Sequence, residues 1–170
     1  MSQLLALLNR LKAEARLERL TDSQLVTWQL VQHQLLFPER INLYGDSGSG
    51  KTFLAWALTN GQDAALFASP EALFQSVFAN EPCRLVIVDN CVSDATELRH
   101  LLAELQMRNS RSALLITRQP NQLGLPLIHL PLPTPQDITI TYHNLSLLEQ
   151  YTHSPRTSGN LWQVIHSTLA

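Results

Sequence analysis

One short segment constrains this chain more than any other feature: a glycine-rich turn between a strand-like run and a helix-like run. The turn follows Ile41-Asn42-Leu43-Tyr44 and leads into an apolar helical pattern over 51–58. It matches the pattern G-x-x-x-x-G-K-T in full, and both flanks are those the pattern requires. Glycines there allow backbone N–H groups to converge on phosphate oxygens without side-chain clashes. The segment therefore predicts a phosphate-binding loop made of Gly45, Asp46, Ser47, Gly48, Ser49, Gly50, Lys51 and Thr52.

The last two residues of the loop carry the expected chemistry. Lys51 supplies a positive charge to the β- and γ-phosphates of a nucleoside triphosphate, and Thr52 supplies a hydroxyl to Mg²⁺. The helix that begins at the loop directs its partially positive end to the same place. A chance glycine turn before a helix is the plain alternative. The agreement of pattern and flanks argues against it.

A second part of such a site is an acidic residue at the end of a neighbouring buried strand. The run Leu85-Val86-Ile87-Val88-Asp89 has this form. Asp89 is expected to hold the water shell of the Mg²⁺ ion. A turn aspartate that merely ends a strand is the alternative interpretation.

The remainder of the chain alternates strands and helices. Thr21-Asp22-Ser23-Gln24 indicates a capping box that opens a helix to about residue 34. Apolar runs without alternation are typical of parallel strands covered on both faces, and their alternation with helices predicts a layered α/β fold. Beyond the loop, strands are expected at 64–68, 85–88, 113–116 and 125–130, and helices at 70–78 and 94–107.

We expect one continuous domain with three segments. A helical segment covers 1–37, with a helix over 3–19, and the phosphate-binding core covers 38–133. The last segment, 134–170, holds two helices at about 136–150 and 160–169. The longest polar gap is only about ten residues, which argues against a second independent domain.

Composition narrows the class of protein. Hydrophobic residues make up 45% of the 170 residues and charged residues 15%, a globular balance too apolar for a disordered chain. The net charge of −2 gives no overall basic field, which argues against a general polyanion binder. No apolar run approaches the ~20 residues that cross a bilayer, and the N-terminus lacks a secretory signal. Cys83, Cys91 and the scattered histidines suggest neither a disulfide nor a metal site, so the cytoplasm is the expected location.

Three segments carry a resemblance to a known family. They are INLYGDSGSGKTFLAWAL at 41–58, LVIVDN at 85–90 and LLITRQPNQLGLP at 114–126. The chain resembles compact AAA+ and STAND-type P-loop ATPases, and its nucleotide site is similar to that of replication initiators of the DnaA and Hda kind. The resemblance covers about residues 40 to 130 and does not choose between the two groups. It implies a P-loop NTPase three-layer sandwich with sheet order 5-1-4-3-2, and ATP and Mg²⁺ as ligands at the strands' carboxyl ends.

The resemblance also exposes a departure beside the Mg²⁺ site. Hydrolytic ATPases of this kind usually carry glutamate directly after the aspartate, where this chain has Asn90. An amide orients water but accepts no proton from it. Asp94 and Glu97 follow closely as alternative acids. Asn90 therefore predicts slow hydrolysis, or hydrolysis that a partner completes.

A third strand end supplies two more candidates. In the resembling ATPases the polar residue that ends this strand, here Thr117, senses the γ-phosphate, and Arg118 follows it directly. A guanidinium delivered to a neighbour's γ-phosphate stabilises transition-state charge and also reports which nucleotide is bound. Arg108, Arg111 and Arg118 lie in a stretch without acids, so a solvated basic patch is an equal alternative.

The C-terminal part departs from the resembling ATPases, which continue into a helical lid with a second arginine. Gly159-Asn160-Leu161 resembles the start of that lid helix, but Trp162 and Gln163 stand where a basic residue is expected. Arg156 is the sole arginine nearby. The resemblance thus implies a lid that is reduced or supplied by another chain.

These features predict an ATP-binding regulatory ATPase, slow or stimulated by a partner, that acts as a nucleotide-dependent assembly or regulatory switch. Self-association or a separate protein partner is expected, and a membrane is not. A DNA transaction, in replication or transposition, follows from the resemblance alone. The N-terminal helix offers a face for DNA, for a docking partner or for solvent, made of Arg10, Lys12, Arg16 and Arg19.

Two other functions stay open. One is a small-molecule or nucleoside kinase, which usually has an acid near the end of the strand after the loop helix. Here that strand leads into Ala68-Ser69-Pro70, and Glu71 is the only acid nearby. The other is a nucleotide-binding subunit without turnover, which Asn90 favours.

Overall fold

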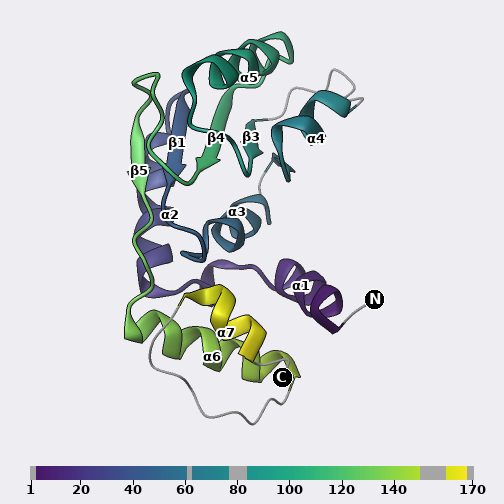
Figure 1. Ribbon diagram of the computed structural model, residues 1–170, viewed down its shortest axis with the longest axis vertical. Helices are drawn as coiled ribbons and strands as arrows, with labels where there is room; N and C mark the ends of the chain where they lie inside the picture. Colours follow the sequence, from purple (N-terminus) through teal and green to yellow (C-terminus); the bar gives the residue numbers. More distant parts are fainter. Residues whose placement is uncertain (1–2, 61–62, 77–83, 150–159, 168–170) are drawn as a thin grey trace.

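A computed structural model describes residues 3–60, 63–76, 84–149 and 160–167 of the chain. Its centre is a five-stranded sheet in the order β2-β3-β4-β1-β5, with every neighbouring pair parallel (Figure 1). Read from the other edge, this is the predicted order 5-1-4-3-2, which is confirmed. The strands are β1 (Arg40–Tyr44), β2 (Ala64–Phe67), β3 (Leu85–Val88), β4 (Ser112–Thr117) and β5 (Leu127–His129).

Helices follow β1, β2 and β3, a loop joins β4 to β5, and helices cover both faces of the sheet (Figure 1). Apolar side chains from alternate strand positions face the two helical layers, as the period of two along a strand requires. The helices are α1 (Gln3–Ala13), α2 (Asp22–Gln34), α3 (Lys51–Thr59), α4 (Pro70–Gln75), α5 (Ala95–Met107), α6 (Pro135–Glu149) and α7 (Leu161–Ser167), with a short 3-10 turn η1 (Leu17–Arg19).

The two faces of the sheet hold two separate apolar cores. Ile41, Leu43 and Ile116 pack with α2 and α3 on one face. Val88 and Leu115 pack with α4 and α5 on the other. The layered α/β fold predicted from the apolar runs is therefore confirmed, as is the three-layer sandwich that the resemblance implies.

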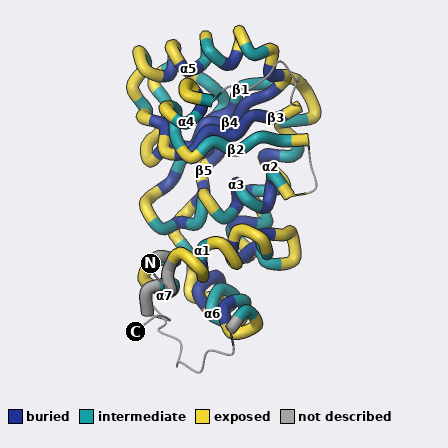
Figure 2. The backbone as a smooth tube through the Cα atoms, turned by 90° about the vertical axis from the view of Figure 1, so that its right-hand side faces the viewer, coloured by how far each residue is buried: buried dark blue, intermediate teal, exposed yellow. Residues whose placement is uncertain are grey.

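A third apolar cluster lies beyond the sheet, where α1, α6 and α7 gather at one end of the molecule (Figures 1 and 2). Leu7 and Leu11 of α1 meet Ile138 and Leu145 of α6 and Val164 of α7. The two ends of the sequence thus share one packed body below the phosphate-binding loop. The division at residues 37 and 133 stays a prediction.

Helix boundaries differ from expectation in two places. The helix expected over 3–19 ends at Ala13. The chain turns there and buries Ala15, whose carbonyl accepts a hydrogen bond of 2.6 Å from the Asn60 amide at the end of α3. Helix α4 ends at Gln75, where the Ser76 hydroxyl bonds the Leu73 carbonyl. Residues 77 and 78 of the expected helix lie outside the described residues.

The last strand is shorter than expected. Residues 125–130 were predicted, and β5 covers Leu127–His129. Pro126 and Pro131 lack the N–H group that a strand ladder needs. They therefore limit the strand at both ends, and such a strand is tolerated at the edge of a sheet.

In the part of the chain that the structure describes, no helix has the length and apolar character to span a membrane.

Candidate phosphate-binding site

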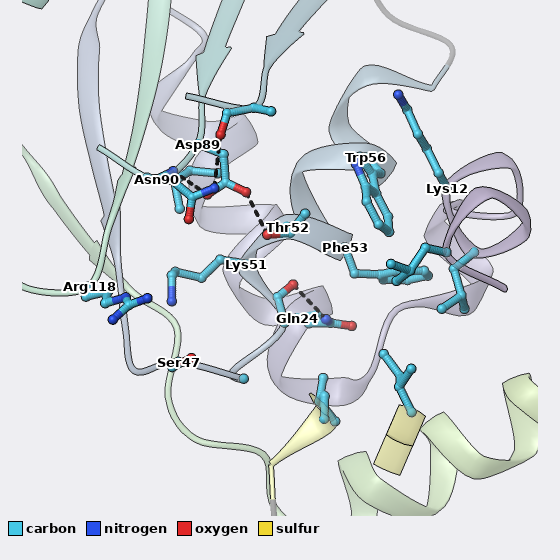
Figure 3. Close-up of a pocket in the computed structure, with 18 of the residues that line it drawn as sticks. Lys12, Gln24, Ser47, Lys51, Thr52, Phe53, Trp56, Asp89, Asn90 and Arg118 are labelled. Atoms are coloured by element: carbon cyan, nitrogen blue, oxygen red, sulfur yellow. Dashed lines mark hydrogen bonds between the residues drawn. The ribbon is translucent and has the colours of Figure 1, made fainter. Parts of the chain in front are cut away.

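A cavity of about 950 Å³ opens at the carboxyl ends of the central strands (Figure 3). The glycine-rich loop after β1 forms its floor, with Lys51 and Thr52 in the first turn of α3. The ends of β3 and β4 bring Asp89 and Thr117 to the same cavity. The far wall comes from α1, α6 and α7. Parallel topology therefore assembles residues from three strands at one edge of the sheet.

The loop has the conformation that its glycines permit. Gly48 and Gly50 have φ values of 80° and 95°, in the left-handed region that side chains disfavour. The Leu161 N–H at the start of α7 donates to the Gly48 carbonyl at 3.0 Å. The buried Gln24 side chain of α2 donates to the Gly50 carbonyl at 3.1 Å. The helices α2 and α7 thus both hold the loop through hydrogen bonds to its carbonyl groups.

Lys51 lies over this loop. Its Nζ donates to the carbonyls of Gly45 and Asp46 at 2.6 and 2.8 Å, with the Ser49 hydroxyl at 3.4 Å. Burial lowers the pKa of Lys51, the Asp89 and Asp46 carboxylates oppose this shift, and the Arg118 guanidinium adds to it. The loop therefore presents a partly desolvated ammonium group to the cavity, where a polyanion interacts with it more strongly than in water.

Thr52 and Asp89 meet directly. The Thr52 hydroxyl donates to a carboxylate oxygen of Asp89 at 2.6 Å, and the other oxygen accepts the Asn90 N–H at 2.7 Å. Hydroxyl and carboxylate oxygens are hard donors that fit Mg²⁺, which binds one or two carboxylates together with phosphates and waters. Among the described residues, no group of three or more His, Cys, Asp or Glu residues gathers as an all-protein metal cage would need.

Asn90 lines the cavity, and its side chain is bonded to backbone at the end of β2. Its φ is 53°, and its amide donates to the Ala68 carbonyl after β2 at 3.0 Å. The two downstream acids do not replace it. Asp94 is the N-cap of α5, accepting from the N–H groups of Thr96 and Glu97, and neither Asp94 nor Glu97 lines the cavity.

Thr117 ends β4 and Arg118 follows it; both line the cavity, but Thr117 is buried and Arg118 is exposed. The Thr117 hydroxyl is buried, donates to the Gln119 carbonyl at 2.6 Å and accepts from the Asn42 amide at 2.9 Å. The exposed Arg118 guanidinium extends toward Lys51 (Figure 3). The γ-phosphate roles of both residues stay predictions.

The other two arginines of that stretch lie elsewhere. Arg108 of the α5 C-cap bonds Glu104 at 2.6 Å and Ser76 at 2.9 Å, so its guanidinium joins α5 to the end of α4. Arg111 precedes β4, at the sheet edge opposite the cavity. Of these three arginines, only Arg118 lines the cavity.

Two buried polar side chains are bonded to residues of the site, and the sequence predicts neither bond. Gln24 was recognised as a helix cap, and its bond to the loop depends on how α2 packs. Asn42 looked like one more residue of the first strand, yet it is fully buried and bonded to Thr117. The side chain of Trp162, and Arg156 as a whole, lie outside what the structure describes.

Comparison with known proteins gives structural matches alone: no protein-family model and no curated protein matches the sequence. One solved structure, the replication initiator DnaA bound to AMPPCP and single-stranded DNA, aligns over 91% of this chain with a TM-score of 0.62 and 13% identity. In its fold, the chain is similar to DnaA. A second structure, of a DNA replication initiation factor, aligns over 91% with a TM-score of 0.64 and 14% identity.

The chain spans 63% of the length of each of these two proteins. The predicted resemblance to initiator-type P-loop ATPases is thus confirmed for the fold. At 13% and 14% identity the likeness concerns the fold alone.

Proposed function

We propose that this chain binds ATP with Mg²⁺ and acts as a nucleotide-dependent assembly or regulatory switch. The observation that carries the proposal is the 2.6 Å contact between Thr52 and Asp89, next to Lys51 in its glycine-rich loop. A hydroxyl, a carboxylate and an ammonium group at a helix N-terminus are the set that a Mg²⁺–triphosphate requires. The cavity of about 950 Å³ has room for the whole nucleotide.

In this proposal each group has one task. The loop from Gly45 to Thr52 binds the phosphates through backbone N–H groups, and Lys51 leaves its carbonyl partners to contact them. Mg²⁺, held by Thr52 and Asp89 with the phosphates, would neutralise charge on the terminal phosphates. Arg118 reaches the same cavity as Lys51, which supports a role in its own chain's site. There its guanidinium reads the terminal phosphate.

Slow turnover follows from the acids available. Asp89 is the only carboxylate among the described residues that line the cavity; it is bonded to Thr52, and in this proposal it would hold the metal. No second carboxylate is at hand there to activate water or an acceptor hydroxyl. This favours a switch over a kinase. It also supports the second candidate, a nucleotide-binding subunit without turnover, because Asn90 is bonded to Ala68.

The partners belong to the proposal as well. A protein of similar fold has been solved with AMPPCP and single-stranded DNA. We extend this to a DNA transaction, in replication or transposition, in which ATP binding sets the state of self-association or of a separate protein partner. A cytoplasmic location fits such a role.

The test is nucleotide binding by calorimetry, with and without Mg²⁺, together with phosphate release. Lys51→Ala removes the ammonium group from the phosphates and should weaken ATP binding by about 100-fold or more. The matched control is Arg111→Ala, which removes one exposed positive charge at the opposite sheet edge and should leave affinity unchanged. Unchanged ATP affinity in Lys51→Ala would show that the phosphate-binding site is wrongly assigned. Fast phosphate release by the chain alone would contradict the switch.

A further inference from the structure

The most buried polar side chain near the site is Asn42, in the middle of β1. It is 0% exposed and stands between the apolar residues Ile41 and Leu43. A buried amide destabilises a sheet unless its donors and acceptor are bonded. An apolar residue at this strand position would be buried without the free-energy cost of desolvating an amide. The bonds that Asn42 makes therefore indicate what it does.

Apart from a weak bond of 3.5 Å to the neighbouring Leu43 carbonyl, these bonds lead to the end of β4 and the loop after it. The Asn42 amide nitrogen donates to the Leu115 carbonyl and to the Thr117 hydroxyl, each at 2.9 Å. Its oxygen accepts the Asn121 N–H at 2.9 Å and the Asn121 side-chain amide at 3.3 Å. One side chain thus fixes the backbone on both sides of Arg118.

Asn121 extends the same network. Its side-chain oxygen accepts the N–H groups of Leu123 and Leu125 at 2.8 and 3.1 Å, which closes the loop on itself. The Thr117 hydroxyl, held by Asn42, donates to the Gln119 carbonyl. Arg118 therefore lies between Thr117 and Asn121, which Asn42 holds in place. Its own guanidinium is exposed and extends toward Lys51 (Figure 3).

We infer that Asn42 is a positioning residue: through Thr117 and Asn121 it fixes the backbone that carries Arg118, and so sets how this site distinguishes ATP from ADP. The inference rests on the proposed function, in which Arg118 reads the terminal phosphate. An arginine on an unanchored loop pays ordering entropy whenever it contacts a ligand, and a fixed backbone reduces that cost.

The measured quantity is the ratio of ATP affinity to ADP affinity, because ADP lacks the phosphate that Arg118 reads. Arg118→Ala should lower this ratio by about tenfold. Asn42→Leu keeps the approximate volume and removes the bonds, and should lower the ratio by at least about threefold with ADP affinity nearly unchanged. Asn121→Ala should have the same effect, and it carries the test if Asn42→Leu does not fold.

A merely structural residue would not move this ratio. Ser110→Ala is the matched control, because it removes a buried hydroxyl that bonds Leu105 at 3.1 Å, at the opposite edge of the sheet. It should lower stability and leave the ratio intact. The double variant Asn42→Leu/Arg118→Ala should show the ratio of Arg118→Ala alone, since both changes act on one contact.

The outcomes separate the two claims. If Arg118→Ala loses the ATP preference while Asn42→Leu and Asn121→Ala keep it, the positioning role is wrong and the proposed function stands. If the effects of Asn42→Leu and Arg118→Ala multiply in the double variant, Asn42 acts by another route and the inference is equally overturned. If the wild-type chain binds neither nucleotide, the proposed function itself fails.

Discussion

At the scale of single residues, the loop glycines show how closely the site is packed. A Cβ on Gly50 would collide with the Gln24 amide nitrogen and lie 2.8 Å from the Leu161 side chain. It would also stand on a backbone with φ of 95°. Gly50 is therefore required twice, by its conformation and by the helices α2 and α7 that close over it.

Gly50→Ala should consequently destabilise the protein by about 1–3 kcal/mol and weaken ADP binding. Thermal unfolding and ADP calorimetry measure the two effects. Gly124→Ala separates their causes, because Gly124 also has a positive φ, 73°, but a Cβ there would meet nothing within 4 Å. Gly124→Ala should lose a similar amount of unfolding free energy through backbone strain and keep its ADP affinity. Equal loss of ADP binding in both would show that contacts at Gly50 do not matter.

At the scale of elements, one carboxylate joins helix α2 to helix α6. Asp137, in the first turn of α6, is fully buried. It accepts the Ser23 N–H and hydroxyl from α2 at 3.1 and 2.7 Å, and the Thr134 N–H and hydroxyl at 2.8 and 2.9 Å. Burial raises the pKa of Asp137, and the hydrogen bonds from Thr134 and Ser23 outweigh it, so the net pKa is lowered.

A lowered pKa makes the contribution of Asp137 depend on pH in one direction. The stabilisation is complete above the ordinary pKa of 3.8 and is lost as pH falls through the lower folded-state value. Asp137→Asn should cost about 1–3 kcal/mol at pH 7, because an amide cannot accept all four bonds. The difference from wild type should shrink toward zero in acid. Urea unfolding from pH 7 to about pH 2 measures it.

The control for this prediction is Asp22→Asn, since Asp22 is an exposed carboxylate at the start of the same α2 helix. It should change stability by less than about 0.5 kcal/mol. A stability difference between wild type and Asp137→Asn that stays constant down to about pH 2 would contradict the role given to the ionised carboxylate.

Helix caps and apolar runs, which are local in the sequence, predicted much of the fold. Contacts between residues far apart in the sequence could not be predicted in this way. The capping box of Thr21 and Gln24 is present with both reciprocal bonds, as the sequence predicts. The second task of Gln24, its bond to Gly50, was invisible because it joins residues 26 positions apart. The apolar runs predicted the sheet, but they gave no reason to single out Asn42, since its partners near Arg118 lie more than 70 positions away.

At the scale of the whole molecule, the cavity lies between two bodies. The sheet and its helices supply the phosphate end, and the cluster of α1, α6 and α7 supplies the far wall. The α7 N-terminus also bonds the loop at Gly48. A nucleotide that fills the cavity would contact both bodies, so its binding free energy should depend on how firmly the helical cluster is packed.

Two leucines of equal burial test this dependence. Leu7 of α1 belongs to the helical cluster and Leu105 of α5 to the core on the other face of the sheet, and both are 0% exposed. Neither lines the cavity. Each change to alanine should cost about 2–5 kcal/mol of stability, from lost burial and the space left behind. Leu7→Ala should also weaken ATP binding, measured by calorimetry well below its unfolding temperature, because it loosens the wall that the nucleotide contacts. Leu105→Ala should keep wild-type affinity, and equal weakening in both variants would mean that global stability, rather than the packing of α1, α6 and α7, governs nucleotide binding.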